Sequence, residues 1–301
     1  MGLKFFDLFA GIGGFRLGME RAGHECIGSC EWDKHARETY KKNYGSYPEY
    51  DDAKDLHPQS LPYFDVLCAG FPCQAFSIAG KRLGFEDTRG TIFFEIARIA
   101  KEKRPPYLFL ENVKGLLNHD KGRTFDTIIS TLDEMGYDAE WQVLNSKYFV
   151  PQNRERVFII GHLRGKRTRQ VFPLGDFDEI SDKKKLRKEE LSRSRSYSSA
   201  IDANYYKGPD GKRTLVYMSN TNANMKQREQ ERTETWTLGT STDFGIREGM
   251  RIRKLTPKEC ERLQGFPDDW TIGSDTQRYK QCGNAVTVNV VEYIAKELRL
   301  G

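Results

Sequence analysis

Close to the N-terminus the chain reads Phe6-Asp7-Leu8-Phe9-Ala10-Gly11-Ile12-Gly13-Gly14-Phe15, an apolar β-type run that leads into a glycine-rich turn. Glycines in such a turn let the backbone approach a ligand closely. A dinucleotide fingerprint would need its third glycine at residue 16, where the chain has Arg16. The turn predicts a ligand-binding strand end in an α/β protein, and a purely structural turn is the alternative.

The next 150 residues continue this rhythm of strand and helix. Apolar residues recur at helical spacing from Phe125 to Met135, with Gly136 at the expected end, and a similar stripe runs from Ile92 to Ala100. This alternation predicts a parallel sheet with helices on both faces. The β-type runs cover residues 4–9, 26–30, 65–69, 107–110, 140–144 and 157–160.

From about Arg164 the regular pattern fails. Charged and Ser-rich sequence and turn-forming residues follow, and an apolar stripe returns only between Val286 and Leu298. We therefore expect a catalytic domain over residues 1–173 that is completed by residues 283–301. Residues 174–282 are expected to form a smaller, irregular domain.

Composition excludes several classes of protein. The 301 residues are 38% hydrophobic and 30% charged, and no apolar run is long enough to span a bilayer. The six cysteines contain no CxxC pair, so we expect no disulfide framework, no metal site and a reducing, cytoplasmic setting. The net charge is +5, and residues 162–213 hold 14 Lys and Arg against 8 Asp and Glu. This basic excess favours either a solvated face or a polyanion-binding surface.

Two strand ends carry candidate catalytic groups. Pro72-Cys73-Gln74 follows one apolar run, and Pro72 stiffens the approach to a displayed thiol, whereas Cys68 within the run is expected to be an inert core residue. Glu111 ends the next run and could be a catalytic acid, a cap or a salt-bridge partner. Arg154 and Arg156, two residues apart in an extended segment, should point the same way and could grip an acid or a phosphate together.

Taken in order, these segments resemble the bacterial-type DNA (cytosine-5) methyltransferase family. Phe71-Pro72-Cys73-Gln74, Glu111-Asn112-Val113 and Gln152-x-Arg154-x-Arg156 carry the resemblance, together with Gln281-Cys282-Gly283-Asn284-Ala285-Val286 near the end. The family implies a Rossmann-like S-adenosylmethionine-dependent methyltransferase domain with a smaller target-recognition domain. Cys73 would add to carbon 6 of a flipped-out cytosine, and Glu111, Arg154 and Arg156 would hold the base.

The resemblance also implies binding residues. Contacts to S-adenosylmethionine, with S-adenosylhomocysteine as product, are expected from Phe9, Gly11, Ile12, Gly14, Glu31, Trp32, Asp52, Pro72, Ile92, Asn284 and Ala285. Contacts to DNA are expected from Gln74, Ser77, Lys81 and Thr237, and the glycine-rich segment 74–91 would close over the flipped base. The expected partner is double-stranded DNA, and we expect a bacterial or phage-encoded monomer with a separate restriction endonuclease as an optional companion.

Three other functions stay open at this point. The same chemistry could act on transfer RNA, although the usual Pro-Pro-Cys of that branch is Phe71-Pro72-Cys73 here. A non-catalytic nucleic-acid binder is opposed by the retained Cys73 and Glu111. A nicotinamide oxidoreductase is opposed by Arg16 in the place of the third glycine.

Overall fold

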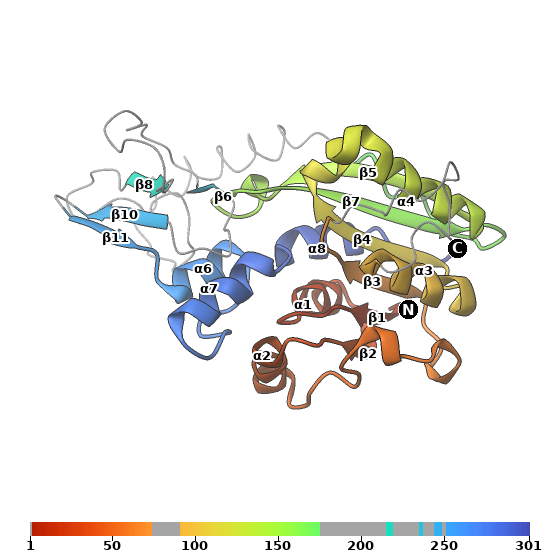
Figure 1. The fold of residues 1–301 in the computed structure, drawn as a ribbon, viewed down its shortest axis with the longest axis horizontal. Coiled ribbons are helices and arrows are strands. Elements are labelled where there is room, and N and C mark those ends of the chain that lie inside the picture. Colours follow the sequence, from red (N-terminus) through yellow and green to blue (C-terminus); the bar gives the residue numbers. More distant parts are fainter. Residues whose placement is uncertain (1, 74–90, 175–214, 219–234, 237–243, 249–250) are drawn as a thin grey trace, which may run out of the picture.

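A six-stranded sheet lies at the centre of the computed structural model, with the strand order β2-β1-β3-β4-β7-β5 (Figure 1). The structure describes the chain except for residues 1, 74–90, 175–214, 219–234, 237–243 and 249–250. The strands of this sheet are β1 (Lys4–Leu8), β2 (Glu25–Cys30), β3 (Val66–Gly70), β4 (Tyr107–Val113), β5 (Tyr137–Asn145) and β7 (Glu155–Leu163). All six predicted β-type runs are therefore strands.

The predicted all-parallel sheet is wrong at one strand. Strands β2, β1, β3 and β4 are parallel to one another, but β7 is antiparallel to both β4 and β5. The connection from β5 to β7 covers only residues 146–154, whereas a parallel crossover needs about a dozen residues or more. The chain therefore turns back and inserts β7 between β4 and β5.

Helices cover both faces of the sheet, as the sequence predicts. Alternate strand residues point to opposite sides, so Leu108 and Leu110 pack on one face while Tyr107 and Phe109 pack on the other. The first face is covered by α3 (Ile92–Lys103) and α4 (Arg123–Glu134), and the second by α1 (Gly14–Arg21) and α8 (Val288–Ala295). The C-terminal helix thus packs against the first helix, which confirms that the chain returns to its N-terminal half.

Three further helices and four short 3-10 helices complete the described elements that surround this sheet. Helix α2 (Lys34–Tyr44) begins at the Asp33 cap and ends at Gly45, which has a φ of 81°. The other helices are α6 (Pro257–Leu263) and α7 (Asp275–Asn284), and the 3-10 helices are η1 (Ala53–Asp55), η2 (Pro58–Ser60), η4 (Lys114–Gly122) and η5 (Ser146–Tyr148). Within the described ranges, no helix is long and apolar enough to cross a membrane.

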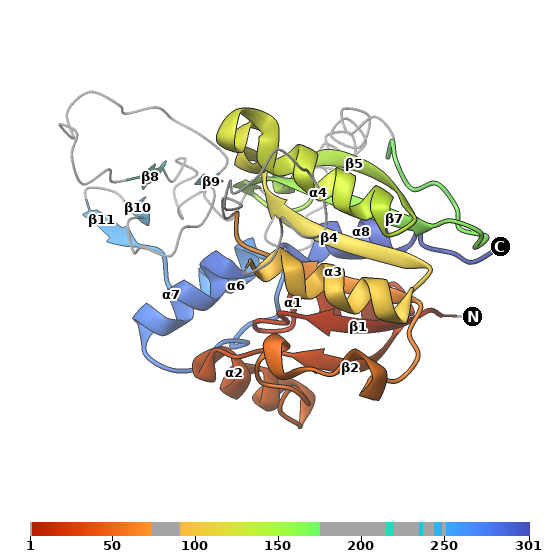
Figure 2. The same cartoon turned by 45° about the vertical axis from the view of Figure 1, so that its right-hand side comes forward.

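A smaller sheet lies apart from the central one (Figure 2). It has the order β11-β10-β8, and a separate two-stranded pairing joins β6 to β9. The strands are β6 (Gln152–Asn153), β8 (Leu215–Met218), β9 (Thr235–Trp236), β10 (Phe244–Glu248) and β11 (Arg251–Lys254).

Residues between 255 and 282 contact the catalytic domain. The Thr39 hydroxyl donates to Gln281 Oε1 at 2.8 Å, and the Trp270 indole donates to the Ile12 carbonyl at 2.9 Å. Ile12, Ala36, Phe266, Trp270 and Val288 form one buried cluster. The division of the chain at residue 283 stays a prediction.

Candidate active site

The carboxyl ends of β1, β2, β3 and β4 meet at one edge of the sheet because these strands are parallel. The glycine-rich turn follows β1, Glu31 follows β2, Cys73 follows β3, and Glu111 lies near the end of β4. Arg156 of β7 is opposite Val113 of β4, so it reaches the same edge. Ligands of open α/β sheets bind at this edge, and the fold brings the predicted segments together there.

The glycine-rich turn has an unusual backbone. Phe9, Gly11 and Gly13 have φ values of 63°, 56° and 84°, which glycine adopts readily and other residues rarely. The Gly11 N–H donates to Glu31 Oε2 at 2.7 Å, and the Ala10 N–H donates to the Cys30 carbonyl at 2.9 Å. A Cβ atom placed on Gly11 would meet nothing within 4 Å, so the backbone is open to a ligand on that side.

Glu31 fastens the turn to the start of α2. Its Oε1 accepts from the Asp33 N–H at 2.7 Å, and burial raises the pKa of this carboxyl while the backbone N–H donors oppose that rise. The adjacent Trp32 is 78% exposed and offers an aromatic face to a ligand. Asp51 pairs with Arg37, whereas the exposed Asp52 accepts from the Lys54 N–H, so the two neighbouring acids have different partners.

Arg16, which replaces the third glycine of a dinucleotide fingerprint, has a structural role. Its guanidinium donates to Glu20 and to the Tyr40 hydroxyl at 2.7 and 2.8 Å, and it lies 4.0 Å from the centre of the Tyr44 ring. It therefore fastens α1 to α2.

Cys73 lies on a loop that is tied to β4. The Phe71 N–H donates to the Glu111 carbonyl at 3.3 Å, and the Asn112 side-chain amide donates to the Phe71 carbonyl at 2.9 Å. Pro72 is exposed and Cys73 is half-buried, with partial burial raising the pKa of its thiol. In contrast, Cys68 is fully buried, as predicted for a core residue.

Glu111 is paired with one of the two predicted arginines. Arg156 Nε lies 3.0 Å from Glu111 Oε1, and both side chains are almost 90% buried. Burial raises the pKa of Glu111, and the positive charges of Arg156 and Arg154 oppose that rise. A Cβ on Gly70 would lie 3.4 Å from Glu111 Oε2, so the carboxyl lies over the end of β3, next to the Cys73 loop.

Arg154 reaches in another direction. Its guanidinium donates to the carbonyls of Gly283 and Ala285 at 3.0 and 2.9 Å, at the end of α7. Burial lowers the pKa of Arg154 to about 9, which leaves it protonated at neutral pH. The sequence predicts that both arginines point the same way and act together with Glu111. The contacts show instead that Arg154 connects this site to the Asn284-Ala285 segment.

The remaining predicted cofactor residues lie around the turn. The side chain of Ile12 is buried in the cluster with Trp270, and a Cβ on Gly14 would lie 2.9 Å from Val286. Ala285 packs against the same cluster, and the adjacent Asn284 is exposed. Ile92 begins α3 and packs against the core cluster that Cys73 also contacts.

The predicted DNA contacts fall outside the described residues. These are Gln74, Ser77, Lys81 and Thr237, and the segment 74–91 predicted to close over the base also lies there, except for Thr91, which caps α3. The residue before Thr237 is described: Trp236 of β9 pairs with Asn153 of β6. Trp236, one residue before Thr237, therefore lies beside the strand that directly precedes Arg154.

Sequence reasoning missed two buried polar residues. Asn112 belongs to the Glu111-Asn112-Val113 motif, but nothing in a single amide predicts that it holds the Phe71 carbonyl. Asp7 is completely buried beneath the glycine turn, and its Oδ2 accepts from the Arg16 N–H at 3.2 Å. The one available signal for Asp7 was a charged residue inside an otherwise apolar strand.

A Rossmann-like sheet with a glycine-rich turn after β1, an acid after β2 and a thiol after β3 defines the class as an S-adenosylmethionine-dependent methyltransferase fold. Solved structures support this class. The Dnmt2 methyltransferase of S. pombe aligns with a TM-score of 0.66 and 18% identity over 97% of this chain and 96% of its own. A putative prophage-encoded DNA modification methyltransferase of E. coli aligns with a TM-score of 0.63 and 21% identity over 98% of each chain.

The family follows from the sequence comparisons. The chain belongs to the C-5 cytosine-specific DNA methylases, whose family model matches residues 3–299. It is 42% identical to type II methyltransferase M.HpaII of Haemophilus parainfluenzae over 98% of this chain and 88% of that protein. It is 38% identical to M.HhaI of Haemophilus parahaemolyticus over 98% and 93% of the two chains. The protein is therefore a DNA (cytosine-5) methyltransferase, and the family implies S-adenosylmethionine as its methyl donor.

Proposed function

We propose that this enzyme methylates carbon 5 of a flipped-out cytosine through a covalent bond between Cys73 and carbon 6. The observation that carries the proposal is the fixed position of the Cys73 loop beside the Glu111–Arg156 pair. Asn112 holds the loop to β4, and Glu111 belongs to the same strand. A nucleophile and an acid are thereby presented to one substrate from adjacent strand ends.

The order of steps follows from the chemistry of cytosine. Carbon 5 is too electron-poor to attack a methyl donor, so the Cys73 thiolate first adds to carbon 6 and makes carbon 5 nucleophilic. S-Adenosylmethionine, when bound, supplies an electrophilic methyl group. After transfer, a base takes the carbon 5 proton, and the electron pair of that C–H bond re-forms the carbon 5–carbon 6 double bond as the Cys73 thiolate leaves.

Glu111 acts at the opposite side of the base. A protonated carboxyl can donate to ring nitrogen 3 and stabilise the charge that develops when Cys73 adds. Burial favours that protonated form, while Arg156 limits the rise in pKa and fixes the carboxyl in place. Arg156 therefore serves as a positioning residue for Glu111.

The residues around the glycine turn fit S-adenosylmethionine. The open space beside Gly11 would admit the donor, Glu31 is held where a carboxylate can accept from ribose hydroxyls, and the exposed Trp32 offers a face to the adenine ring. Asp52 would contact the adenine, and Phe9, Pro72, Ile92 and Asn284 would line the remaining boundary. Ile12, Gly14 and Ala285 would shape the turn from behind, because they pack on the adjoining core.

Double-stranded DNA is the proposed substrate, recognised by the smaller domain around residues 174–282. Flipping the cytosine costs a few kcal/mol, which contacts from Gln74, Ser77, Lys81 and Thr237 would offset. The names of the relatives place them in type II systems, so a separate restriction endonuclease is a natural companion. We propose that the enzyme works as a monomer, because the parallel strands of one sheet already bring the turn, Glu31, Cys73 and Glu111 to a common edge.

Incorporation of labelled methyl groups into nucleic acid tests this function. Wild-type protein and the Cys73→Ala variant are incubated with labelled S-adenosylmethionine and either duplex DNA of mixed sequence or transfer RNA. The expected result is label in DNA with the wild type alone. Label in transfer RNA and none in DNA would contradict the proposed substrate, and equal labelling by both proteins would contradict the role of Cys73.

A further inference from the structure

Two aromatic side chains hold the glycine turn from behind. The Trp270 indole N–H donates to the Ile12 carbonyl at 2.9 Å, and the Tyr44 hydroxyl donates to the Gly13 carbonyl at 3.0 Å. The two rings touch each other edge to face, with their centres 5.7 Å apart. Consecutive carbonyls of the turn are thus fixed by two donors that also pack together.

The turn requires such support. Its positive φ at Phe9, a residue other than glycine, costs conformational energy and persists only where the surroundings hold it, whereas Gly11 and Gly13 adopt positive φ values readily. A Cβ at Gly13 would lie 2.4 Å from the Tyr44 ring, so the glycine and the aromatic ring are fitted to each other. Because the carbonyls point back toward these rings, the other side of the turn is left for a ligand.

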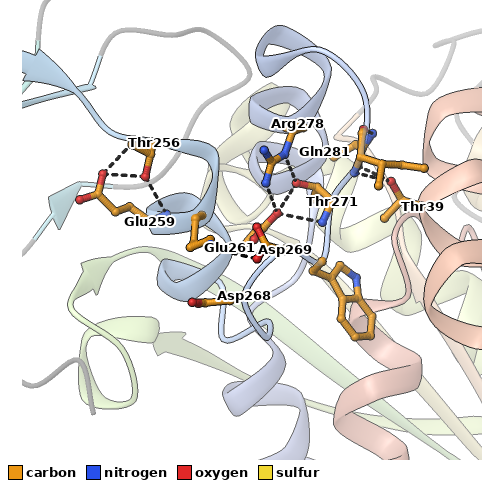
Figure 3. Close-up of polar contacts among 12 residues, drawn as sticks. Thr39, Thr256, Glu259, Glu261, Asp268, Asp269, Thr271, Arg278 and Gln281 are labelled. Carbon is orange, nitrogen blue, oxygen red and sulfur yellow. Dashed lines mark hydrogen bonds and ion pairs between the residues drawn. The ribbon is translucent and has the colours of Figure 1, made fainter. Parts of the chain in front are cut away.

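The position of Trp270 is itself determined by a buried polar network, whose members Glu261, Thr271 and Arg278 point toward one another in Figure 3. Glu261 Oε1 accepts from the Thr271 N–H at 2.8 Å and from the Arg278 guanidinium at 2.9 Å, which fixes the connection between α6 and α7. The Asn43 amide donates to the Trp270 carbonyl at 3.0 Å, next to Tyr44 on α2. Trp270 therefore arrives from a rigid connection and not from a free loop.

We propose that Trp270 and Tyr44 are positioning residues for S-adenosylmethionine, acting through the carbonyls of Ile12 and Gly13. This inference rests on the proposed binding of that molecule at the glycine turn. Removing either donor leaves a turn carbonyl without its partner, so the turn relaxes and its open side no longer matches the ligand. If only their rings mattered, Trp270 and Tyr44 would be ordinary core residues. Removing the donor atom while keeping a ring therefore separates a packing role from a positioning role.

Three variants distinguish the packing role from the positioning role, because each removes one hydrogen-bond donor and keeps an aromatic ring. Trp270→Phe and Tyr44→Phe delete the donors to the turn. Tyr279→Phe is the matched control, because the Tyr279 hydroxyl donates to the Leu255 carbonyl in the same helix pair and does not contact the turn. Binding of S-adenosylhomocysteine without DNA is measured by titration calorimetry, with urea unfolding of each protein alongside.

We expect Trp270→Phe and Tyr44→Phe to weaken S-adenosylhomocysteine binding by about tenfold, and Tyr279→Phe to change it less than about twofold. At saturating cofactor, turnover of the first two variants should stay close to wild type, because Cys73 and Glu111 are untouched. Wild-type affinity in both variants would overturn the inference, and so would an equal loss in the Tyr279→Phe control. If Trp270→Phe fails to fold, Tyr44→Phe alone decides. Absence of binding by the wild type would instead overturn the proposed cofactor site itself.

Discussion

Glu111 illustrates how one side chain is adjusted by its surroundings. Burial favours its neutral form, and the neighbouring guanidinium groups favour its charged form. The net shift is upward, so the proton is retained to a higher pH than in a free carboxyl. This direction suits a group that must donate to ring nitrogen 3.

The pH dependence of catalysis tests this role of Glu111. Activity that needs a protonated Glu111 falls as the pH rises through its raised pKa, whereas activity that needs the Cys73 thiolate rises with pH. We expect Glu111→Gln to lower kcat by about 10²- to 10⁴-fold and to remove the falling limb, because glutamine does not titrate. A pH profile of kcat/KM checks this. A variant with the same falling limb as the wild type would assign that limb to another group.

Asp7 is a second buried acid with an upward shift. Burial raises its pKa to about 8, and the Arg16 N–H bond opposes the rise. Since the folded pKa exceeds the unfolded value of about 3.9, its contribution to stability is complete below about pH 4 and is lost as the pH rises through 8.

Asp7→Asn should therefore stabilise the protein only at high pH. Relative to the wild type, we expect a gain of at least about 2 kcal/mol in the free energy of unfolding at pH 9 and little change at pH 4, because the loss develops between these values and asparagine carries no buried charge. Urea unfolding at the two pH values gives the difference. An equal effect at both would show that ionisation of Asp7 does not matter for stability.

At the scale of single residues, the sequence predicted positions better than contacts. The chain order placed the glycine turn, Glu31, Cys73 and Glu111 at strand ends, and the structure gathers them at one edge. It could not show that Arg154 bonds the carbonyls of Gly283 and Ala285, because that contact joins segments about 130 residues apart.

Among the elements, α6 shows how local sequence fixes a helix start. The Thr256 hydroxyl accepts from the Glu259 N–H, and Glu259 Oε2 accepts from the Thr256 N–H at 2.7 Å, with Pro257 at the first helical position. This capping box begins the helix that leads to the Trp270 connection.

Loss of this cap should be measurable. We expect Thr256→Ala to lower the free energy of unfolding by about 1 kcal/mol and Thr256→Ser to keep most of it, because serine retains the hydroxyl. The midpoints of urea unfolding compare the two variants. A loss in Thr256→Ser as large as in Thr256→Ala would mean that the methyl group, and not the cap, stabilises this end.

Element identity was predictable, whereas the direction of one strand was not. Alternating apolar residues reveal a strand such as β7, but they are the same for parallel and antiparallel pairing. The short connection after β5 contained the missing information, since residues 146–154 cannot make a crossover. The length of the connection therefore determines the direction of β7, which the spacing of its apolar residues does not.

At the scale of the whole molecule, the two ends of the chain are joined by the packing of the first helix, α1, against the last helix, α8. Gly18 of α1 faces α8 so closely that a Cβ would lie 2.6 Å from Val291 Cβ and 3.0 Å from the Val288 carbonyl oxygen. The apolar stripe near the C-terminus predicted that this helix returns to the first domain. The sequence could not identify α1 as the partner of this helix. The close approach depends on Gly18, and nothing in the sequence distinguishes Gly18 from the glycines of the turn just before it.

The sign of one substitution tests this packing. Gly→Ala in an unpacked helix stabilises it by about 1 kcal/mol, but Gly18→Ala should destabilise the protein by about 1–3 kcal/mol because Val291 and the α8 backbone must move. Gly115→Ala is the control, since its Cβ would meet only Val113 Cγ2 at 3.9 Å. Urea unfolding compares both with the wild type, and a stabilised Gly18→Ala would contradict the close helix pair.

The central claim is that Cys73 carries out cytosine methylation within a specific DNA sequence. Its most direct test is bisulfite sequencing of mixed-sequence duplex DNA after incubation with S-adenosylmethionine and either wild-type or Cys73→Ala protein. We predict that the wild type protects cytosines within one short motif and that Cys73→Ala protects none. No protection by the wild type, or the same protection by both proteins, would contradict the claim.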